Sequence, residues 1–292
     1  MVVNVEREEF DVAVRSHRLH AQRFGSRSAP LVVGVHGLSG NMKSFDFVGE
    51  FLGGDALQLV ALDLRGRGNS ETTGPGTYGW ENHAFDVFAV ADTLGFERFS
   101  LVGHSMGGSV AMKAAELDGS RLDAITLVDV AGRVDRGVGA VIASVIDRLD
   151  DVYDSTDGYV DAVKAQGFVQ PWSEYWDRRY RYEIEEVDGG VRSRVDARAV
   201  AEDRTYTATQ DPYDRWKHLT MPTLLLRATR ELLPGVGYVV PADDRDRFVR
   251  EVRRGTVVEV EANHLTINTH RHAATAMSRF FADALDGGRA RA

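Results

Sequence analysis

Six short apolar runs, separated by segments of helical periodicity, constrain the fold of this chain more than any other feature. Each run is rich in β-branched residues and apolar at successive positions, as expected for a strand that is buried on both faces. Because the runs alternate with helical segments, the sequence predicts an α/β fold with a mostly parallel open sheet and helices on both faces. The runs are Leu31–Val35, Leu57–Leu64, Phe99–Val102, Ala124–Val130, Thr223–Leu226 and Thr256–Val260.

The segments between these runs complete the predicted core. Helices are expected over His83–Leu94, Met106–Leu117 and His270–Leu285, where apolar residues recur at helical spacing. The first part of the chain, Phe10–Phe24, alternates weakly and is predicted to form an antiparallel hairpin at the edge of the sheet.

The alternation of strands and helices stops at about residue 132 and resumes at Met221-Pro222. The stretch between is rich in aromatic and charged residues and has helical patches without a clear buried strand. We therefore interpret residues 1–131 and 221–292 as one core domain, and residues 132–220 as an inserted, mainly helical cap. Ordinary peripheral helices are the alternative interpretation of this stretch.

Bulk properties exclude several functions. A chain of 292 residues with a net charge of −9 and no basic stripe is not expected to bind nucleic acid. The sequence has no cysteine, which excludes thiol chemistry, and no apolar run of the roughly 20 residues that a membrane span needs. The first residues do not resemble a signal peptide. A cytoplasmic monomer or weak homodimer that acts on a small molecule is therefore expected.

The motif G-x-S-x-G follows the run Phe99–Val102 and precedes a predicted helix. In this context the serine sits on a sharp turn between strand and helix, and small neighbours such as Gly103 and Gly107 leave room for that turn. The turn presents the hydroxyl of Ser105 at the strand ends, where ligands bind in open α/β sheets. Ser105 is thus the predicted nucleophile.

A second motif, H-G-L-S-G, begins at His36 directly after the first apolar run. A developing oxyanion needs two backbone donors, which the motif logic assigns to Leu38 and to Met106, the residue after the nucleophile. His36 is expected to hold this loop, and contact with substrate is the weaker alternative.

A serine nucleophile needs a base and a carboxylate that orients the base. His264 follows the last strand run and is the predicted base, whereas His270 and His272 are expected to open the last helix. Two carboxylates stand at strand ends, Asp129 and Glu231, and either could reach a histidine on the next loop.

Together these residues resemble the α/β-hydrolase superfamily, in particular its cap-bearing serine esterase, lactonase and carbon–carbon hydrolase branch. H-G-L-S-G, G-H-S-M-G, N-H-L and the turn D-L-R-G-R-G-N-S, residues 63–70, carry the resemblance. The family's usual G-x-x-D acid loop is here A-T-R-E, which ends at Glu231. Some members instead use an Asp one strand earlier, where Asp129 stands, and Asp129 is preferred on that ground.

The expected function is hydrolysis of a carboxylic ester or lactone through an acyl-enzyme, without metal or organic cofactor. Carbon–carbon or amide hydrolysis with the same triad, and a non-catalytic small-ligand binder on the same fold, are the alternatives. In the cap, Trp172 and Trp176 either line an acyl pocket or pack the cap onto the core. The arginines at 178, 179 and 181 either bind a substrate carboxylate or form a solvated helix face.

Overall fold

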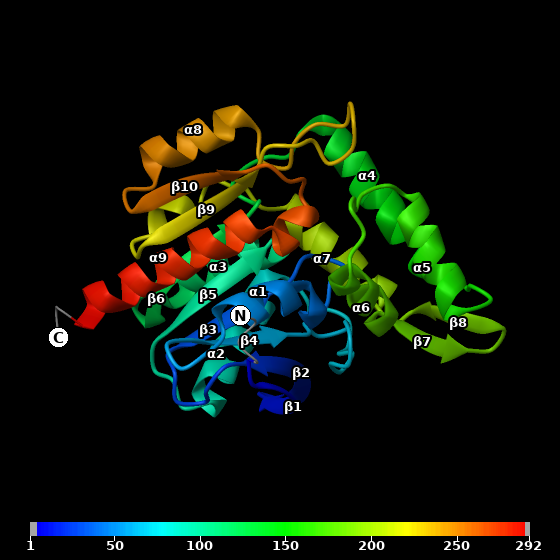
Figure 1. Ribbon diagram of the computed structural model, residues 1–292, viewed down its shortest axis with the longest axis horizontal. Helices are drawn as coiled ribbons and strands as arrows, with labels where there is room; N and C mark the ends of the chain where they lie inside the picture. Colours follow the sequence, from blue (N-terminus) through cyan, green and yellow to red (C-terminus); the bar gives the residue numbers. More distant parts are fainter. Residues whose placement is uncertain (1–4, 290–292) are drawn as a thin grey trace.

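The computed structural model describes residues 5–289 of the chain, with side chains to residue 286, and its centre is an eight-stranded sheet in the order β1-β2-β4-β3-β5-β6-β9-β10 (Figure 1). The six strands β4, β3, β5, β6, β9 and β10 run parallel to one another. Strand β2 pairs antiparallel with β4 and with β1, so the hairpin β1–β2 lies at one edge. The strands are β1 Arg7–Val14, β2 His17–Phe24, β3 Leu31–Val35, β4 Gln58–Leu62, β5 Phe99–His104, β6 Leu122–Val128, β9 Thr223–Ala228 and β10 Gly255–Val260.

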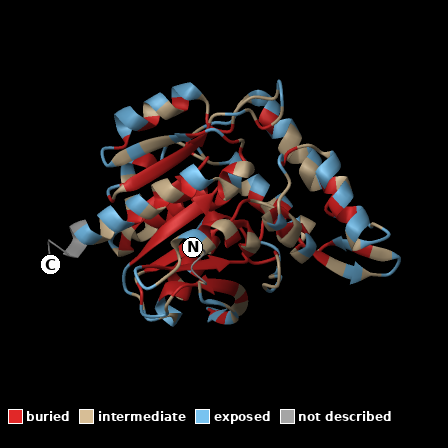
Figure 2. Cartoon of the chain, viewed as in Figure 1, coloured by how far each residue is buried: buried red, intermediate tan, exposed pale blue. Residues whose placement is uncertain are grey.

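All six apolar runs form strands of this sheet, and the predicted edge hairpin is present, so the predicted fold class is confirmed. The four strands β3, β4, β5 and β9 are buried along their whole length, which agrees with their continuous apolar sequence (Figure 2). Strand β10 differs, because it lies at the other edge and is largely half-exposed.

Two apolar layers cover the two faces of the sheet. Helices α2, α3 and α8 contribute to one buried cluster, and α1 and α9 contribute to the other. Among the described helices, none combines the length and the apolar character that crossing a membrane requires. The core helices are α1 Asp46–Leu52, α2 Trp80–Thr93, α3 Met106–Asp118, α8 Ala242–Glu251 and α9 Arg271–Arg289, with short 3-10 helices η1 Met42–Phe45, η2 Gly119–Arg121, η3 Trp216–His218 and η4 Thr266–Thr269.

Residues 132–220 lie to one side of the sheet and contain most of a separate apolar cluster, in which Tyr159, Trp176 and Tyr180 are buried (Figure 1). The end of this stretch behaves differently, because Trp216 packs into the main core against Phe248. The elements are α4 Arg136–Asp147, α5 Thr156–Ala165, α6 Glu174–Tyr182, β7 Ile184–Val187, β8 Gly190–Ser193 and α7 Ala197–Ala208.

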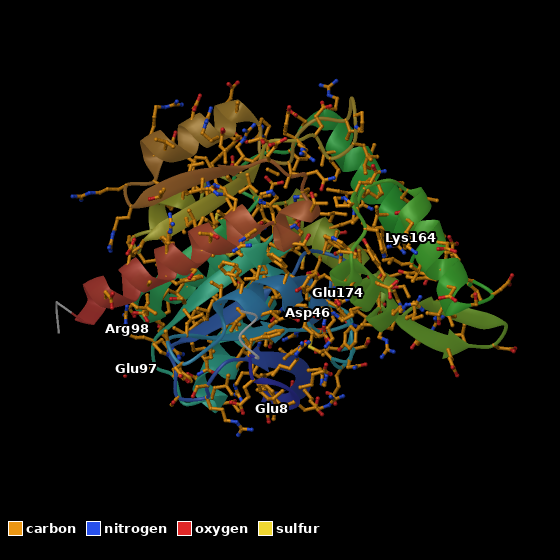
Figure 3. All side chains as sticks on the ribbon, viewed as in Figure 1. Glu8, Asp46, Glu97, Arg98, Lys164 and Glu174 are labelled. Carbon is orange, nitrogen blue, oxygen red and sulfur yellow. The ribbon has the colours of Figure 1, made fainter. Side chains whose placement is uncertain are left out.

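The hairpin β7–β8 adds two short, partly exposed strands to a stretch that was expected to be mainly helical, without a clear buried strand. Its two strands pair antiparallel around Asp188 and Gly189, in a sheet separate from the main one. Helix α6 is joined to the body by Arg178, which pairs with Asp46 and Glu50 of α1. Figure 3 labels Asp46 at the start of α1 and Glu174 at the start of α6.

Candidate active site

Ser105 stands between the last residue of β5 and the first residue of α3, in a backbone conformation that is rare for a residue with a side chain. Its φ is 54° and its ψ is −123°, and its amide donates to the carbonyl of Val128 in the neighbouring strand β6. Such a conformation persists only where the surrounding structure holds it. Here β5 and β6 hold it, and Ser105 remains partly exposed while its neighbours are buried.

Two glycines allow the chain to turn this sharply. A Cβ on Gly107 would lie 1.9 Å from the carbonyl oxygen of Val35, and a Cβ on Gly103 would lie 2.3 Å from that of Gly107. Real Cβ atoms do not approach so closely, so both positions require glycine. The strand, turn and helix expected from G-x-S-x-G are therefore present with the packing that the motif needs.

His264 follows β10 and is hydrogen-bonded to the carboxylate of Asp129, which follows β6. The distance from His264 Nδ1 to Asp129 Oδ2 is 2.8 Å, and both side chains are buried. The other oxygen of Asp129, Oδ1, accepts from the amide of Ala228 at 2.9 Å. Like Ser105, Asp129 has a positive φ, of 51°. The carboxylate is thus fixed at both oxygens and holds the imidazole by Nδ1, so that Nε2 is the nitrogen left for proton transfer.

The loop that carries His264 is held from two sides. Asn263 Oδ1 accepts from the amides of Leu265 and Thr266, and Asn263 Nδ2 donates to the carbonyl of Phe168 at 2.7 Å. On the other side, His104 lies directly before Ser105 in the chain and is hydrogen-bonded through Nε2 to the backbone oxygen of His264 at 2.8 Å. The His104 and His264 ring centres are 4.6 Å apart, which brings the His264 loop beside the serine turn. Within residues 5–289, no hydrogen bond joins Ser105 Oγ to His264.

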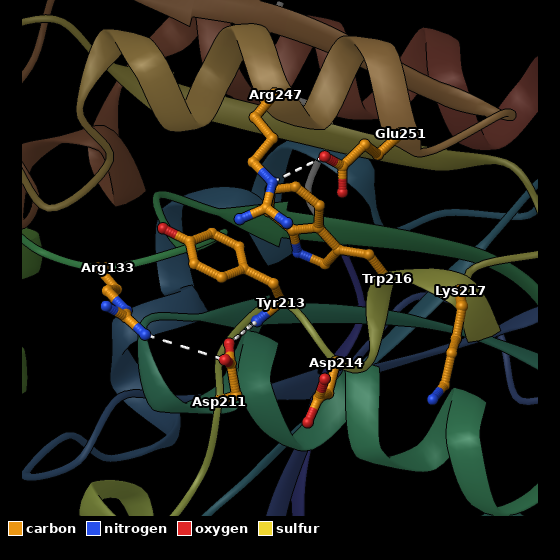
Figure 4. A pocket seen from close by; sticks show the side chains of 8 residues that line it. All are labelled: Arg133, Asp211, Tyr213, Asp214, Trp216, Lys217, Arg247 and Glu251. Carbon is orange, nitrogen blue, oxygen red and sulfur yellow. Dashed lines mark hydrogen bonds and ion pairs between the residues drawn. The ribbon is translucent and has the colours of Figure 1, made fainter.

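The loop after Asp129 is fixed by residues from the end of the 132–220 stretch and from α8. Trp216 Nε1 donates to the carbonyl of Ala131 at 3.1 Å, and Asp244 accepts from the amide of Arg133 at 2.7 Å and from the hydroxyl of Tyr213 at 2.8 Å. Trp216, Tyr213 and Arg133 line an open cleft with a volume of about 520 Å³. Figure 4 shows the side chains that surround it. Ser105, His264 and Asp129 do not line this cleft, whose charged side chains are balanced in sign.

The loop after β3 carries the predicted oxyanion donor Leu38 and packs against Ser105. A Cβ on Gly37 would lie 3.2 Å from the Cβ of Ser105. Within residues 5–289, neither the amide of Leu38 nor that of Met106 donates to another protein group. Met106 begins α3, so its amide also belongs to the positive end of that helix. An oxyanion formed beside Ser105 would need two such donors.

His36 lies fully buried beneath this loop, and its ring joins two backbone groups. Nδ1 is bonded to the carbonyl of Gly37 at 2.7 Å, and Nε2 accepts from the amide of Leu64 at 3.0 Å. Burial lowers the pKa of His36 to about 3, so the ring stays neutral at ordinary pH. With both nitrogens occupied, His36 has none to offer a substrate.

His36 gives a testable pH dependence of stability. The unfolded imidazole takes up a proton below about pH 6.5, whereas the folded ring, with a pKa of about 3, does not. Protonation therefore favours the unfolded state as the pH falls from about 6.5 toward 3. We expect the free energy of unfolding of wild type, relative to His36→Asn, to fall by about 2 kcal/mol between pH 7 and pH 5. Urea denaturation of both proteins measures this, and parallel pH profiles would contradict it.

A buried ion pair links the same loop to helix α7. Arg67 is fully buried, donates through Nε to the carbonyl of Leu38 at 3.1 Å and pairs through Nη2 with Asp203 at 2.6 Å. Asp203 also contacts Nε2 of the buried His83 at 3.1 Å. Burial alone would raise the pKa of Asp203, but the charge and hydrogen bond of His83 and the charge of Arg67 outweigh burial and hold this pKa well below its usual range. This pair was not foreseen, because nothing local in the sequence connects residues 67 and 203.

The remaining predicted residues lie elsewhere. Glu231 accepts from the amide of Gly235 at 2.8 Å and is not bonded to His264. Trp176 is buried in the cluster of the 132–220 stretch, and Trp172, half-buried, stacks on Tyr180 at 5.6 Å. His270 ends η4 just before α9 begins. Among the described residues, no group of three or more histidine or carboxylate side chains is arranged to hold a metal ion.

The sequence matches the model of the alpha/beta hydrolase family over residues 32–277. A serine hydrolase-like protein of Danio rerio is 25% identical over 95% of this chain and 88% of its own length. N-formylmaleamate deformylase of Pseudomonas putida is 34% identical over 119 residues, which are 41% of this chain and 44% of the deformylase. The chain spans half or less of the length of several other curated relatives that it matches.

A solved structure, that of E-2-(acetamidomethylene)succinate hydrolase, has the same fold. It superimposes with a TM-score of 0.83 over 94% of this chain and 99% of that chain, at 22% identity. This likeness concerns the fold, whereas the match to the family model covers most of the sequence, including the elbow at Ser105 and the loop of His264. The chain therefore belongs to the alpha/beta hydrolase family.

Proposed function

We propose that the protein is a serine hydrolase that cleaves a carboxylic ester or lactone of a small to medium substrate through an acyl-enzyme. The observation that carries the proposal is the contact of 2.8 Å between His264 Nδ1 and Asp129 Oδ2. The loop that carries His264 is also hydrogen-bonded to His104, the residue before Ser105. A serine, a histidine and a carboxylate on three adjacent loops are the parts that acyl transfer to serine requires.

In the proposed first half-reaction, Ser105 Oγ attacks the carbonyl carbon while Nε2 of His264 takes the hydroxyl proton. Asp129 stabilises the imidazolium through Nδ1–H. The carbonyl oxygen becomes an oxyanion that accepts from the amides of Leu38 and Met106. When the tetrahedral intermediate collapses, the carbon–oxygen bond to the leaving group breaks, and His264 returns the proton to the departing alcohol.

In the second half-reaction, water takes the place of the alcohol. His264 removes a proton from the water as its oxygen attacks the acyl carbon, and the same two amides hold the second oxyanion. Breaking of the bond to Ser105 Oγ releases the carboxylic acid, and the proton on His264 returns to the serine. The protein's own groups supply every proton transfer in this cycle.

Hydrolysis of an N-acyl bond is the second candidate, because one relative that resembles this chain over 119 residues is named a deformylase of N-formylmaleamate. The same three residues would serve both reactions, but an amide leaving group must be protonated as it departs, which places a stricter demand on His264. Comparing an ester with the amide of the same acyl group separates the two.

A fluorophosphonate probe, followed by peptide mapping, tests the proposed nucleophile without knowledge of the substrate. We expect one labelled peptide, modified at Ser105, and no label after denaturation or in His264→Ala. A panel of 4-nitrophenyl esters, matched anilides and lactones then measures kcat/KM by bond type. Labelling of another serine would refute the mechanism. Absence of both labelling and turnover would favour a non-catalytic binder on this fold.

A further inference from the structure

Arg179 of α6 is a buried arginine whose charge meets no carboxylate. Its residue exposure is 8%, and no acidic side chain within residues 5–286 lies in ion-pair distance of its guanidinium. Each of the other six buried arginines among the described side chains pairs with an acid. These pairs are Arg23–Glu8, Arg65–Asp86, Arg67–Asp203, Arg148–Glu183, Arg215–Glu116 and Arg227–Glu259. An isolated buried cation is unfavourable, and arginine cannot shed its proton to relieve this.

Its surroundings satisfy the guanidinium only in part. Arg179 Nη1 donates to the hydroxyl of Tyr180 at 3.3 Å, whereas Nε is buried without a hydrogen-bond partner. The guanidinium carbon lies 4.8 Å from the ring centre of Tyr180 and 5.4 Å from that of Trp176. These aromatic faces favour a cation and form an apolar wall beside it. A guanidinium has five N–H donors in a planar fork, so donors remain for an anion.

The backbone of Arg179 is bonded to a residue near the candidate active site. Its carbonyl accepts from Asn41 Nδ2 at 3.2 Å, and Asn41 follows the loop that packs against Ser105. Burial is the main cause that lowers the pKa of both His36 and His104, and the positive charge of Arg179 adds to it. Arg179 therefore acts electrostatically on the residue beneath the oxyanion loop and on the residue before the nucleophile.

We propose that Arg179 binds a carboxylate of the substrate, so that the protein acts on acyl compounds with a free carboxylate a short chain away from the scissile carbonyl. This inference rests on the proposed function and names its substrate class. A carboxylate is favoured over a phosphate because it carries one negative charge, which matches the single cation. A phosphate with a charge of about −1.5 to −2 would leave excess negative charge buried.

A matched pair of substrates tests the proposal. Mono-4-nitrophenyl glutarate and 4-nitrophenyl valerate have acyl chains of equal length, of which the first ends in a carboxylate and the second in a methyl group. We expect wild type to prefer the glutarate ester, and Arg179→Met to lower the ratio of the two kcat/KM values about 100-fold, mainly through KM. Arg179→Lys keeps the charge without the fork and should give an intermediate ratio. A ratio within threefold of wild type in Arg179→Met would overturn the proposal.

The control is Arg181→Met on the same helix, since Arg181 pairs with Asp157 and Asp177 and is exposed. Its ratio should equal that of wild type, and an equal loss would show a general effect of charge. If Arg179 served only to stabilise the fold, Arg179→Met would lower Tm. Because the variant removes an unpaired buried charge, we expect Tm to be unchanged or higher. If Arg179→Met fails to fold, the Arg179→Lys ratio decides, and a ratio equal to that of wild type would then overturn the proposal.

A binding measurement separates failure of this site from failure of the proposed function. Glutarate is expected to raise the Tm of Ser105→Ala and not that of Ser105→Ala/Arg179→Met, whether or not the protein hydrolyses esters. Stabilisation without turnover would keep the carboxylate site and refute the hydrolase. Suppose instead that wild type hydrolyses both esters, that glutarate does not shift Tm and that Arg179→Met leaves the ratio of kcat/KM values unchanged. That result would keep the hydrolase and refute the carboxylate site. A larger shift by inorganic phosphate than by glutarate would overturn the assignment to a carboxylate.

Discussion

Ser105→Ala is expected to lower kcat by roughly 10⁴–10⁶-fold on any ester that wild type hydrolyses, with little change in KM. The variant removes the attacking oxygen and leaves His264, Asp129 and both oxyanion amides in place. Alanine keeps a Cβ, so the positive φ at this position is as demanding for the variant as for serine. The fold should therefore persist, and rates measured with purified variant over several days of reaction give the size of the loss.

Ser109→Ala is the matched control for this experiment. Ser109 lies in the next turn of α3 and is buried, and its hydroxyl has no part in the proposed mechanism. Its activity should stay within a few-fold of wild type. Turnover of Ser105→Ala at more than about a hundredth of the wild-type rate would show that another group attacks the substrate.

Asp129→Asn is expected to lower kcat by roughly 10³–10⁴-fold, again with a small effect on KM. The carboxylate holds Nδ1–H of His264 and stabilises the imidazolium, and an amide would turn an N–H toward that nitrogen and favour the wrong tautomer. The amide oxygen can still accept from Ala228, whose bond to Asp129 Oδ1 is 2.9 Å long. Circular dichroism and Tm should therefore change little while kcat falls.

Glu231→Gln is the comparison that decides between the two acids. In the structure Glu231 accepts from Gly235 and has no bond to His264, so kcat should stay within about threefold of wild type. A collapse of kcat in Glu231→Gln, with Asp129→Asn nearly fully active, would assign the acid to the loop after β9. Equal and partial losses would mean that neither carboxylate alone orients the histidine.

The parts of the fold that the sequence predicts are those whose signal is local. Strand β5 is apolar at successive positions because both faces of the sheet are covered, and its six residues are all buried. The hairpin β7–β8 was not predicted because its four-residue strands, I-E-E-V and G-V-R-S, hold few apolar residues in a stretch full of charge. The turn Asp188-Gly189 was the available signal, since Asp-Gly is favoured in tight hairpin turns.

The candidate site divides in the same way. Ser105 and the glycines beside it are recognisable because the turn restricts side chains within a few residues. The contact between His264 and Asp129 joins residues 135 positions apart, and the sequence offered Glu231 equally well on chemical grounds. Only the register of β6 beside β9 brings Asp129 to the histidine. The lack of an acidic partner for Arg179 is likewise not visible in the sequence, because it depends on which arginines the nearby carboxylates pair with in the folded protein.

The loop of residues 36–41 is tethered twice to the elements beside the sheet. Arg67 connects the carbonyl of Leu38 to Asp203 of α7, and Asn41 binds the backbone of Arg179 in α6. Any rigid displacement of α6 and α7 away from the sheet would thus pull on Leu38, the residue whose amide is proposed to hold the oxyanion. A movement of α6 and α7 that let a substrate in would therefore disturb the oxyanion donor, so that substrate entry and transition-state stabilisation would oppose each other.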